Sequence, residues 1–184
     1  PWVDVSVHDV ATHRVQCDVL PAMTLGVGYL QRTGRRRIAA LGMGKDSIPA
    51  TLAPFHRLLA ARGMATRPEW TPQLRRTSER GGFDGMRAIW ACPEKPDALL
   101  VMDDILAKGA VQAIQTLGIR VPQDVALISL ANKGSGLFYP ISFPRLEFDP
   151  QTIMRKAGKL LETLMARPDA PPRTIRVAPV LREA

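Results

Sequence analysis

The chain has 184 residues, of which 46% are hydrophobic and 23% charged, and its formal net charge is +8. This composition predicts a globular chain with an ordinary core and excludes an intrinsically disordered protein. No apolar run approaches the ~20 residues that span a bilayer, and the first residues do not resemble a signal peptide, so we expect no membrane contact. Because residue 1 is not methionine, we expect the chain to be a piece of a longer protein.

Short apolar runs alternate with amphipathic stretches along the chain. In the first half of the chain the pattern predicts a helix over 20–30 that stops at Gly34, a strand at 37–42, a helix from about Asp46 or Ser47 to Gly63 and a helix at 83–91. In the second half it predicts a strand at 98–102, a helix capped by Asp104 that stops at Gly118, a strand at 125–130, a helix after Pro150 and a final strand at 174–180. Continuous apolar runs are typical of parallel strands covered on both faces, so the alternation predicts an α/β fold with parallel sheets. In such sheets ligands bind beyond the carboxyl ends of the strands, here after Leu41, Met102 and Leu130.

Cysteine spacing and the distribution of basic residues narrow the function classes. Cys17 and Cys92 share no metal-ligand spacing with the histidines, so neither a metal nor another cofactor is expected. Two isolated thiols suit a reducing cytoplasm. Basic residues are dense only at 35–37 and 75–76, without the interleaved aromatics of a single-strand-binding surface, which predicts a solvated basic surface rather than a direct nucleic-acid interface.

Four stretches carry a resemblance to a known family. They are TGRRRIAALG at 33–42, KPDALLVMDD at 95–104, AVQAIQTLGIRVPQDVALISL at 110–130 and VAPVLRE at 177–183. Together they resemble segments of the effector-binding domain of LacI/GalR-type transcriptional regulators. The third stretch is the most specific, since its glycine, proline and aspartate all match.

The resemblance implies a type 1 periplasmic-binding-protein-like fold, with two Rossmann-like lobes that contain parallel sheets and an N-terminal lobe that is incomplete here. It implies that residues 1–42 and 143–166 belong to the N-terminal lobe, and residues 43–141 and 174–184 to the C-terminal lobe. The implied function is ligand sensing and dimerisation. A small-molecule effector, a sugar or other polar metabolite, would bind between the two lobes of one subunit, and two subunits would form a homodimer. Operator DNA would bind a helix-turn-helix headpiece absent from this chain.

The resemblance also suggests four effector-binding residues. Asp103 stands where the family has an asparagine that points into the cleft, although an aspartate here could instead cap a helix. Asn132 stands where the family has the second of two aspartates, although an asparagine also suits a turn. Thr51 replaces a common arginine, and Thr77 replaces a common stacking aromatic.

Those two threonines change the expected effector. Without the arginine fork, bidentate binding of a carboxylate or phosphate is lost, so a neutral or cationic polar effector is expected. Arg75, Arg76, Phe138 and Tyr139 could compensate, but surface roles are expected for them.

Other motifs and functions compete with this interpretation of the sequence. The segment 42–45, GMGK, lacks the full spacing of a phosphate-binding loop. Asp9 with His8 or His13 could form a catalytic dyad, but no nucleophile elbow accompanies it, so no enzyme is expected. A periplasmic solute-binding protein and a degenerate domain that only dimerises remain as alternatives.

Overall fold

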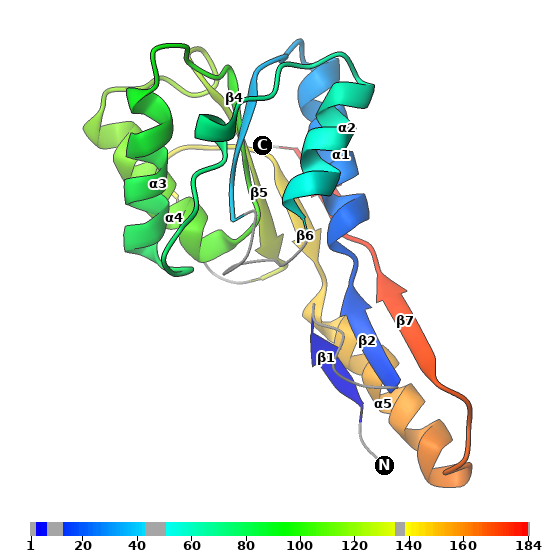
Figure 1. The fold of residues 1–184 in the computed structure, drawn as a ribbon. Coiled ribbons are helices and arrows are strands. Elements are labelled where there is room, and N and C mark those ends of the chain that lie inside the picture. The colour runs from blue at the N-terminus through cyan, green and yellow to red at the C-terminus, as the bar shows by residue number, and fades with distance from the viewer. Residues whose placement is uncertain (1–2, 7–12, 43–50, 135–138, 184) are drawn as a thin grey trace.

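The structure is a computed structural model that describes residues 3–6, 13–42, 51–134 and 139–183. Their strands form two sheets, a three-stranded one in the order β1-β2-β7 and a five-stranded one in the order β3-β4-β5-β6-β8 (Figure 1). Neighbouring strands are parallel, except that β8 runs antiparallel to β6. In chain order the elements are β1 (Asp4–Ser6), β2 (His13–Cys17), α1 (Val19–Arg32), β3 (Ile38–Leu41), α2 (Leu52–Ala61), the 3-10 turn η1 (Pro68–Trp70), α3 (Glu79–Ala91), β4 (Ala98–Val101), α4 (Asp104–Thr116), β5 (Ala126–Asn132), β6 (Arg145–Phe148), α5 (Pro150–Ala166), β7 (Arg173–Val177) and β8 (Val180–Arg182).

The five-stranded sheet has a hydrophobic cluster on each face, as the continuous apolar runs predict. In β4, Ala98 and Leu100 belong to one cluster, and Leu99 and Val101 belong to the other. Helices α1 and α2 contribute to the first cluster, whereas α3 and α4 contribute to the second. Each fully buried leucine contributes roughly 1.5–3 kcal/mol to the hydrophobic stabilisation. The doubly covered sheet confirms the predicted α/β fold.

Helices α3 and α4 pack closely through glycine. A Cβ on Gly109 would lie 1.7 Å from the Glu79 carbonyl oxygen, and one on Gly82 would lie 2.0 Å from that of Leu106. The two glycines therefore let the helix backbones approach closely, which a side chain at either position would prevent.

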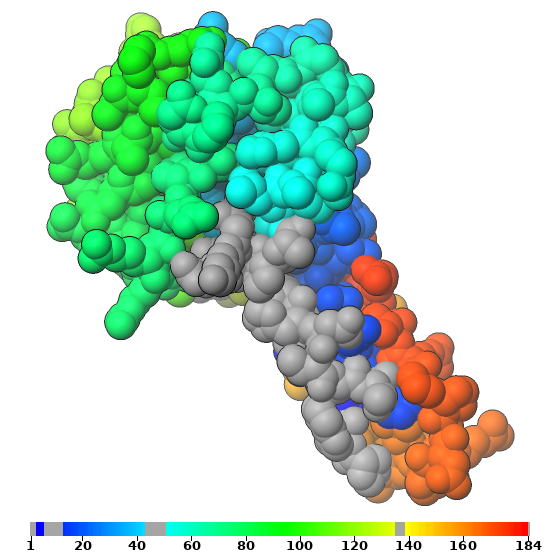
Figure 2. Space-filling view, in the orientation of Figure 1, coloured from blue at the N-terminus to red at the C-terminus, as the bar shows by residue number. Residues whose placement is uncertain are grey.

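The three-stranded sheet forms a narrower arm. Helix α5 covers one face of this sheet, where its Ile153, Ala157 and Leu160 join Val15 of β2 in the core. Figure 2 shows this arm extending from the broader body that the five-stranded sheet and its helices form. The chain passes between the two sheets after β2, after β6 and after β7. The first and last of these crossovers touch, since the Asp18 amide donates to the Val177 carbonyl at 2.8 Å.

The sheets divide the chain differently from the predicted lobes. Strand β3 was expected in the N-terminal lobe but pairs with β4, and β6 was expected there but pairs with β5. The single strand expected at 174–180 is two strands, of which β7 pairs with β2 and only β8 joins the five-stranded sheet. Strand pairing thus groups these strands differently from the lobes that the resemblance implies. The helix start expected near Asp46 or Ser47 lies outside the described residues.

Candidate functional site

A hollow of about 240 Å³ lies between the two sheets, at the carboxyl ends of their strands. It is lined by Cys17, Val19, Gly42, Thr77, Met102, Asp103, Asp104, Leu130, Ala131, Asn132 and Phe148. The positions after Leu41, Met102 and Leu130, predicted from the sequence to border a ligand, all belong to this lining. The rule that α/β sheets bind ligands at their carboxyl edges therefore locates the hollow.

Asp103 lines the hollow and also caps α4. Its Oδ1 accepts hydrogen bonds from the amides of Ile105 at 2.9 Å and Leu106 at 3.1 Å. Asp104 was predicted to be the cap of this helix. The cap is Asp103 instead, because the helix begins one residue earlier than predicted. Burial raises the pKa of the Asp103 carboxyl, an effect that the two amides oppose and the charge of Asp104 reinforces. Among the described residues no hydrogen bond engages Oδ2, so this oxygen can accept one from a ligand.

Two more of the four suggested residues meet Asp103 at the hollow. Asn132 is the last residue of β5, and Thr77 precedes Ser78, the residue that caps α3. Thr51 is not among the lining residues. It is only 4% exposed and occupies the cap position of α2, where its carbonyl accepts from the Phe55 amide at 2.9 Å.

The crossovers contribute lining residues that the sequence pattern did not indicate. Cys17 ends β2, Val19 begins α1 and Phe148 ends β6. Burial raises the pKa of the Cys17 thiol. The apolar pattern predicts no strand at 13–17 or 145–148, so the carboxyl-edge rule could not point to Cys17 or Phe148.

Arg75, Arg76 and Tyr139, which could have compensated for the lost arginine and aromatic, do not line the hollow. Arg75 and Arg76 are exposed and border a separate depression beside α3. The Tyr139 hydroxyl donates to the Asp104 carbonyl at 3.0 Å, and burial, with a smaller contribution from the charge of Asp104, raises the pKa of Tyr139 to about 12. Phe138 lies outside the described residues.

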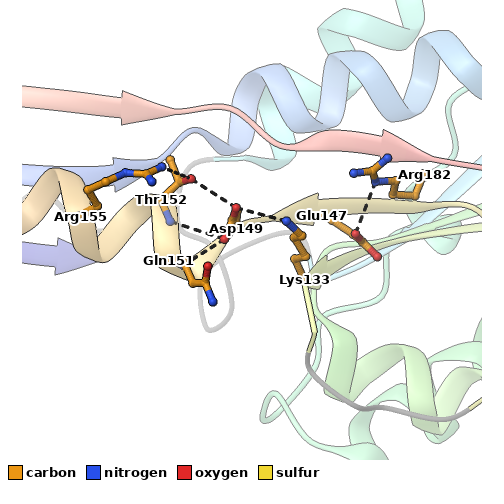
Figure 3. Close-up of polar contacts among 7 residues, drawn as sticks. All are labelled: Lys133, Glu147, Asp149, Gln151, Thr152, Arg155 and Arg182. Carbon is orange, nitrogen blue, oxygen red and sulfur yellow. Dashed lines mark hydrogen bonds and ion pairs between the residues drawn. The ribbon is translucent and has the colours of Figure 1, made fainter.

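An ion pair adjoins the hollow at the middle crossover (Figure 3). Lys133 Nζ lies 3.4 Å from Asp149 Oδ2, and Asp149 caps α5 by accepting from the Gln151 amide at 3.0 Å. Lys133 follows Asn132, and Asp149 follows Phe148, so the partners are the next residues along the chain from two lining residues. The ion pair thus joins the end of β5, in the body, to the first turn of α5, in the arm.

The lining suits noncovalent binding. Its carboxylates, amide and threonine hydroxyl can accept or donate hydrogen bonds, and Phe148, Leu130 and Val19 offer apolar contact. Across residues 3–6, 13–42, 51–134 and 139–183, no three histidine, cysteine, aspartate or glutamate side chains group as a metal site would require. Nor does any helix in those ranges have the length and apolar character that crossing a bilayer demands. The candidate catalytic residues His8 and Asp9 lie outside them.

Comparisons with known proteins agree with this geometry. Residues 27–183 match the family described as a periplasmic binding protein-like domain. The HTH-type transcriptional repressor PurR of Erwinia tasmaniensis is 28% identical over 157 residues, which are 84% of this chain and 46% of the repressor. The chain therefore spans about half the length of the curated relatives it matches.

Solved structures share the fold. A candidate LacI transcriptional regulator from Bacillus cereus subsp. cytotoxis has a TM-score of 0.87 at 20% identity, covering 100% of this chain and 66% of that one. A sugar-binding transcriptional regulator of the LacI family from Escherichia coli, solved in complex with phosphate, has a TM-score of 0.78 at 22% identity, covering 98% of this chain and 65% of that one.

Proposed function

We propose a regulatory function from one premise, that this chain belongs to the family of periplasmic binding protein-like domains. In this proposal it is the effector-binding domain of a transcriptional regulator of the LacI/GalR type. The observation that carries the proposal is the hollow at the carboxyl edges of both sheets, in a chain whose curated relatives are transcriptional repressors. A transport function as a periplasmic solute-binding protein has no such support among these relatives.

The proposed lobes follow the sheets. One would comprise residues 3–18 and 149–177, and the other residues 19–148 and 180–183. An effector held between them would change their relative angle, because it would contact Asp103 and Asn132 on one side and Cys17 on the other. The ion pair between Lys133 and Asp149 is placed to respond to such a change.

We expect a small polar effector that is neutral or cationic. Among the described residues, the side chains that line the hollow include two carboxylates and no lysine or arginine. A carboxylate with a free oxygen accepts hydrogen bonds from hydroxyl and ammonium groups, but it repels phosphates and other carboxylates. Thr77 and Asn132 add neutral polar groups. Effector binding in the hollow would involve these residues and not Thr51.

The remaining parts of the proposal concern the longer protein. We propose that it acts as a homodimer, binds operator DNA through a segment outside this chain, works in the cytoplasm and does not catalyse a reaction. This chain alone should bind duplex DNA weakly and without sequence preference, because its basic residues are spread out and no recognition helix is expected in it.

A ligand screen tests the proposal. The intact protein that contains this chain would be screened by thermal shift against polyols, sugars, sugar acids and amines. Each hit would then be titrated by calorimetry into the wild-type protein and into the Asp103→Asn and Asn132→Ala variants. We expect a sugar, polyol or amine to bind, and each substitution to weaken it about 10- to 100-fold through the loss of a charged or buried hydrogen bond. A hit whose affinity neither substitution changes would contradict effector binding in the hollow.

A further inference from the structure

We propose a second binding site, on the outer surface of α1, for a small anionic amphiphile, meaning a molecule with one carboxylate or phosphate group and an apolar chain. The site is a hollow of about 720 Å³ that is separate from the one between the sheets and shares no lining residue with it. It is lined by Leu20, Pro21, Thr24, Leu25, Gly28, Gln31 and Arg32 of α1 and by Arg62, which follows α2. Helices α1 and α2 lie side by side on one face of the body (Figure 1).

Two guanidinium groups converge at one end of this hollow. A Cβ on Gly28 would lie 3.6 Å from Arg32 Nη1 and 3.7 Å from Arg62 Nη1, so both nitrogens reach the same point above the helix. Arg62 is held there, since the same nitrogen donates to Gln31 Oε1 at 2.8 Å. Neither arginine forms an ion pair with an acidic residue in the described part of the chain.

This arrangement fits an anion. Two like charges that share one point repel each other, and an anion between them replaces repulsion by attraction to both. Guanidinium groups present paired donors that match the oxygens of a carboxylate or phosphate. Gly28 is buried beneath these guanidinium groups, and a larger residue there would place its side chain between them and hold them apart.

The rest of the hollow fits an apolar chain. Leu20, Pro21 and Leu25 border it, and Leu20 is 46% exposed, which is high for a leucine in an ordered helix. Leu20, Thr24, Gly28 and Arg32 recur every fourth residue and therefore form one stripe along α1. At a rise of ~1.5 Å per residue, Leu20 lies ~12 Å from Gly28, so an apolar chain can run along the stripe while its charged end meets the arginines.

Decanoate, below its micelle concentration, is the probe for this site. Calorimetry with the intact protein should detect decanoate binding that weakens as ionic strength rises, with decanol and inorganic phosphate each binding more weakly than decanoate. Arg32→Ala and Arg62→Ala should each weaken decanoate about 10-fold or more, since each removes a charged hydrogen bond. Arg57→Ala is the matched control, because this exposed arginine of α2 removes the same charge but does not line the hollow.

Gly28→Leu tests the geometry without unfolding the helix. Leucine favours an α-helix over glycine, and a Cβ at position 28 would make only ordinary contacts with the two arginines, so this variant should stay folded, which its melting temperature checks. We expect it to abolish decanoate binding, and we expect Asp103→Asn to leave that binding unchanged. The proposal would be overturned if Gly28→Leu, Arg32→Ala and Arg62→Ala all bound decanoate with wild-type affinity. It would also be overturned if the protein self-associated through this face and bound no decanoate.

Discussion

Substitutions at Asp103 separate its structural role from its proposed binding role. Asp103→Ala removes the acceptor of two amide hydrogen bonds at the start of α4, at 2.9 and 3.1 Å. Loss of such a cap costs ~0.5–2 kcal/mol, which for a chain of this size lowers the melting temperature by roughly 2–4 °C per kcal/mol. Asp103→Asn keeps a cap acceptor and removes only the charge. We therefore expect Asp103→Ala to be destabilised and Asp103→Asn to be close to wild type in urea unfolding.

The pH dependence of Asp103 gives the same experiment a second readout. Burial raises the pKa of this carboxyl in the folded state, so its contribution to stability is fully present below the ordinary pKa of 3.8 and is lost as the pH rises through the folded value. Asp103→Asn should remove that dependence and should be at least as stable as wild type at neutral pH. Equal destabilisation of the alanine and asparagine variants would refute the capping argument, and so would an alanine variant as stable as wild type.

Three further predictions concern packing, electrostatics and assembly. Gly109→Ala should lose ~1–3 kcal/mol or more of unfolding free energy, because its Cβ would lie 1.7 Å from the Glu79 carbonyl oxygen. Gly158→Ala in α5, where a Cβ would meet nothing within 4 Å, should gain up to ~1 kcal/mol. Chemical denaturation of both variants checks this contrast. NMR titration should find the pKa of Asp124 at about 2, because the hydrogen bonds that Arg120 donates lower it. The contribution of Asp124 to stability is therefore present above the ordinary pKa of 3.8 and lost as the pH falls through about 2. Arg120→Gln should return this pKa toward 3.8. Sedimentation of the intact protein at micromolar concentration should show a dimer, and a strict monomer would argue against the proposed assembly.

The sequence predicted the five-stranded sheet well where apolar runs are continuous. The run at 98–102 is short and continuously apolar, which is typical of a strand covered on both faces, and all four residues of β4 are buried. The α3 helix begins four residues before the expected start at Phe83, because Ser78 provides the cap with its hydroxyl, which accepts from the Gly81 amide at 3.0 Å. Two glycines at 81–82 made that turn resemble a loop in the sequence.

The arm could not be predicted as well, because its strands are short and carry charged residues. Arg14 in β2 and Arg176 in β7 interrupt the apolar pattern, and only pairing across 160 positions of sequence brings these two strands together. The residues of the candidate site divide in the same way, into some that the sequence predicted and some that it did not. Asp103 and Asn132 follow strongly apolar strands and were found, whereas Cys17 and Phe148 belong to crossovers whose position depends on the whole fold.

Measuring the distance between the two sheets tests the central claim most directly. Spin labels would be attached to cysteines at the exposed positions Gln112 in α4 and Lys159 in α5, after replacement of Cys17 and Cys92 by serine. Because Cys17 lines the hollow, calorimetry would first measure the effector affinity of this background, so that the effector is used at a saturating concentration. Pulsed electron paramagnetic resonance on the intact protein would then record the distance with and without a saturating effector from the screen. We predict that the effector shifts the distance distribution, and that Asp103→Asn requires a higher effector concentration for the same shift. An identical distribution in the free and the saturated wild-type protein would contradict a domain that senses its ligand by changing the angle between its lobes.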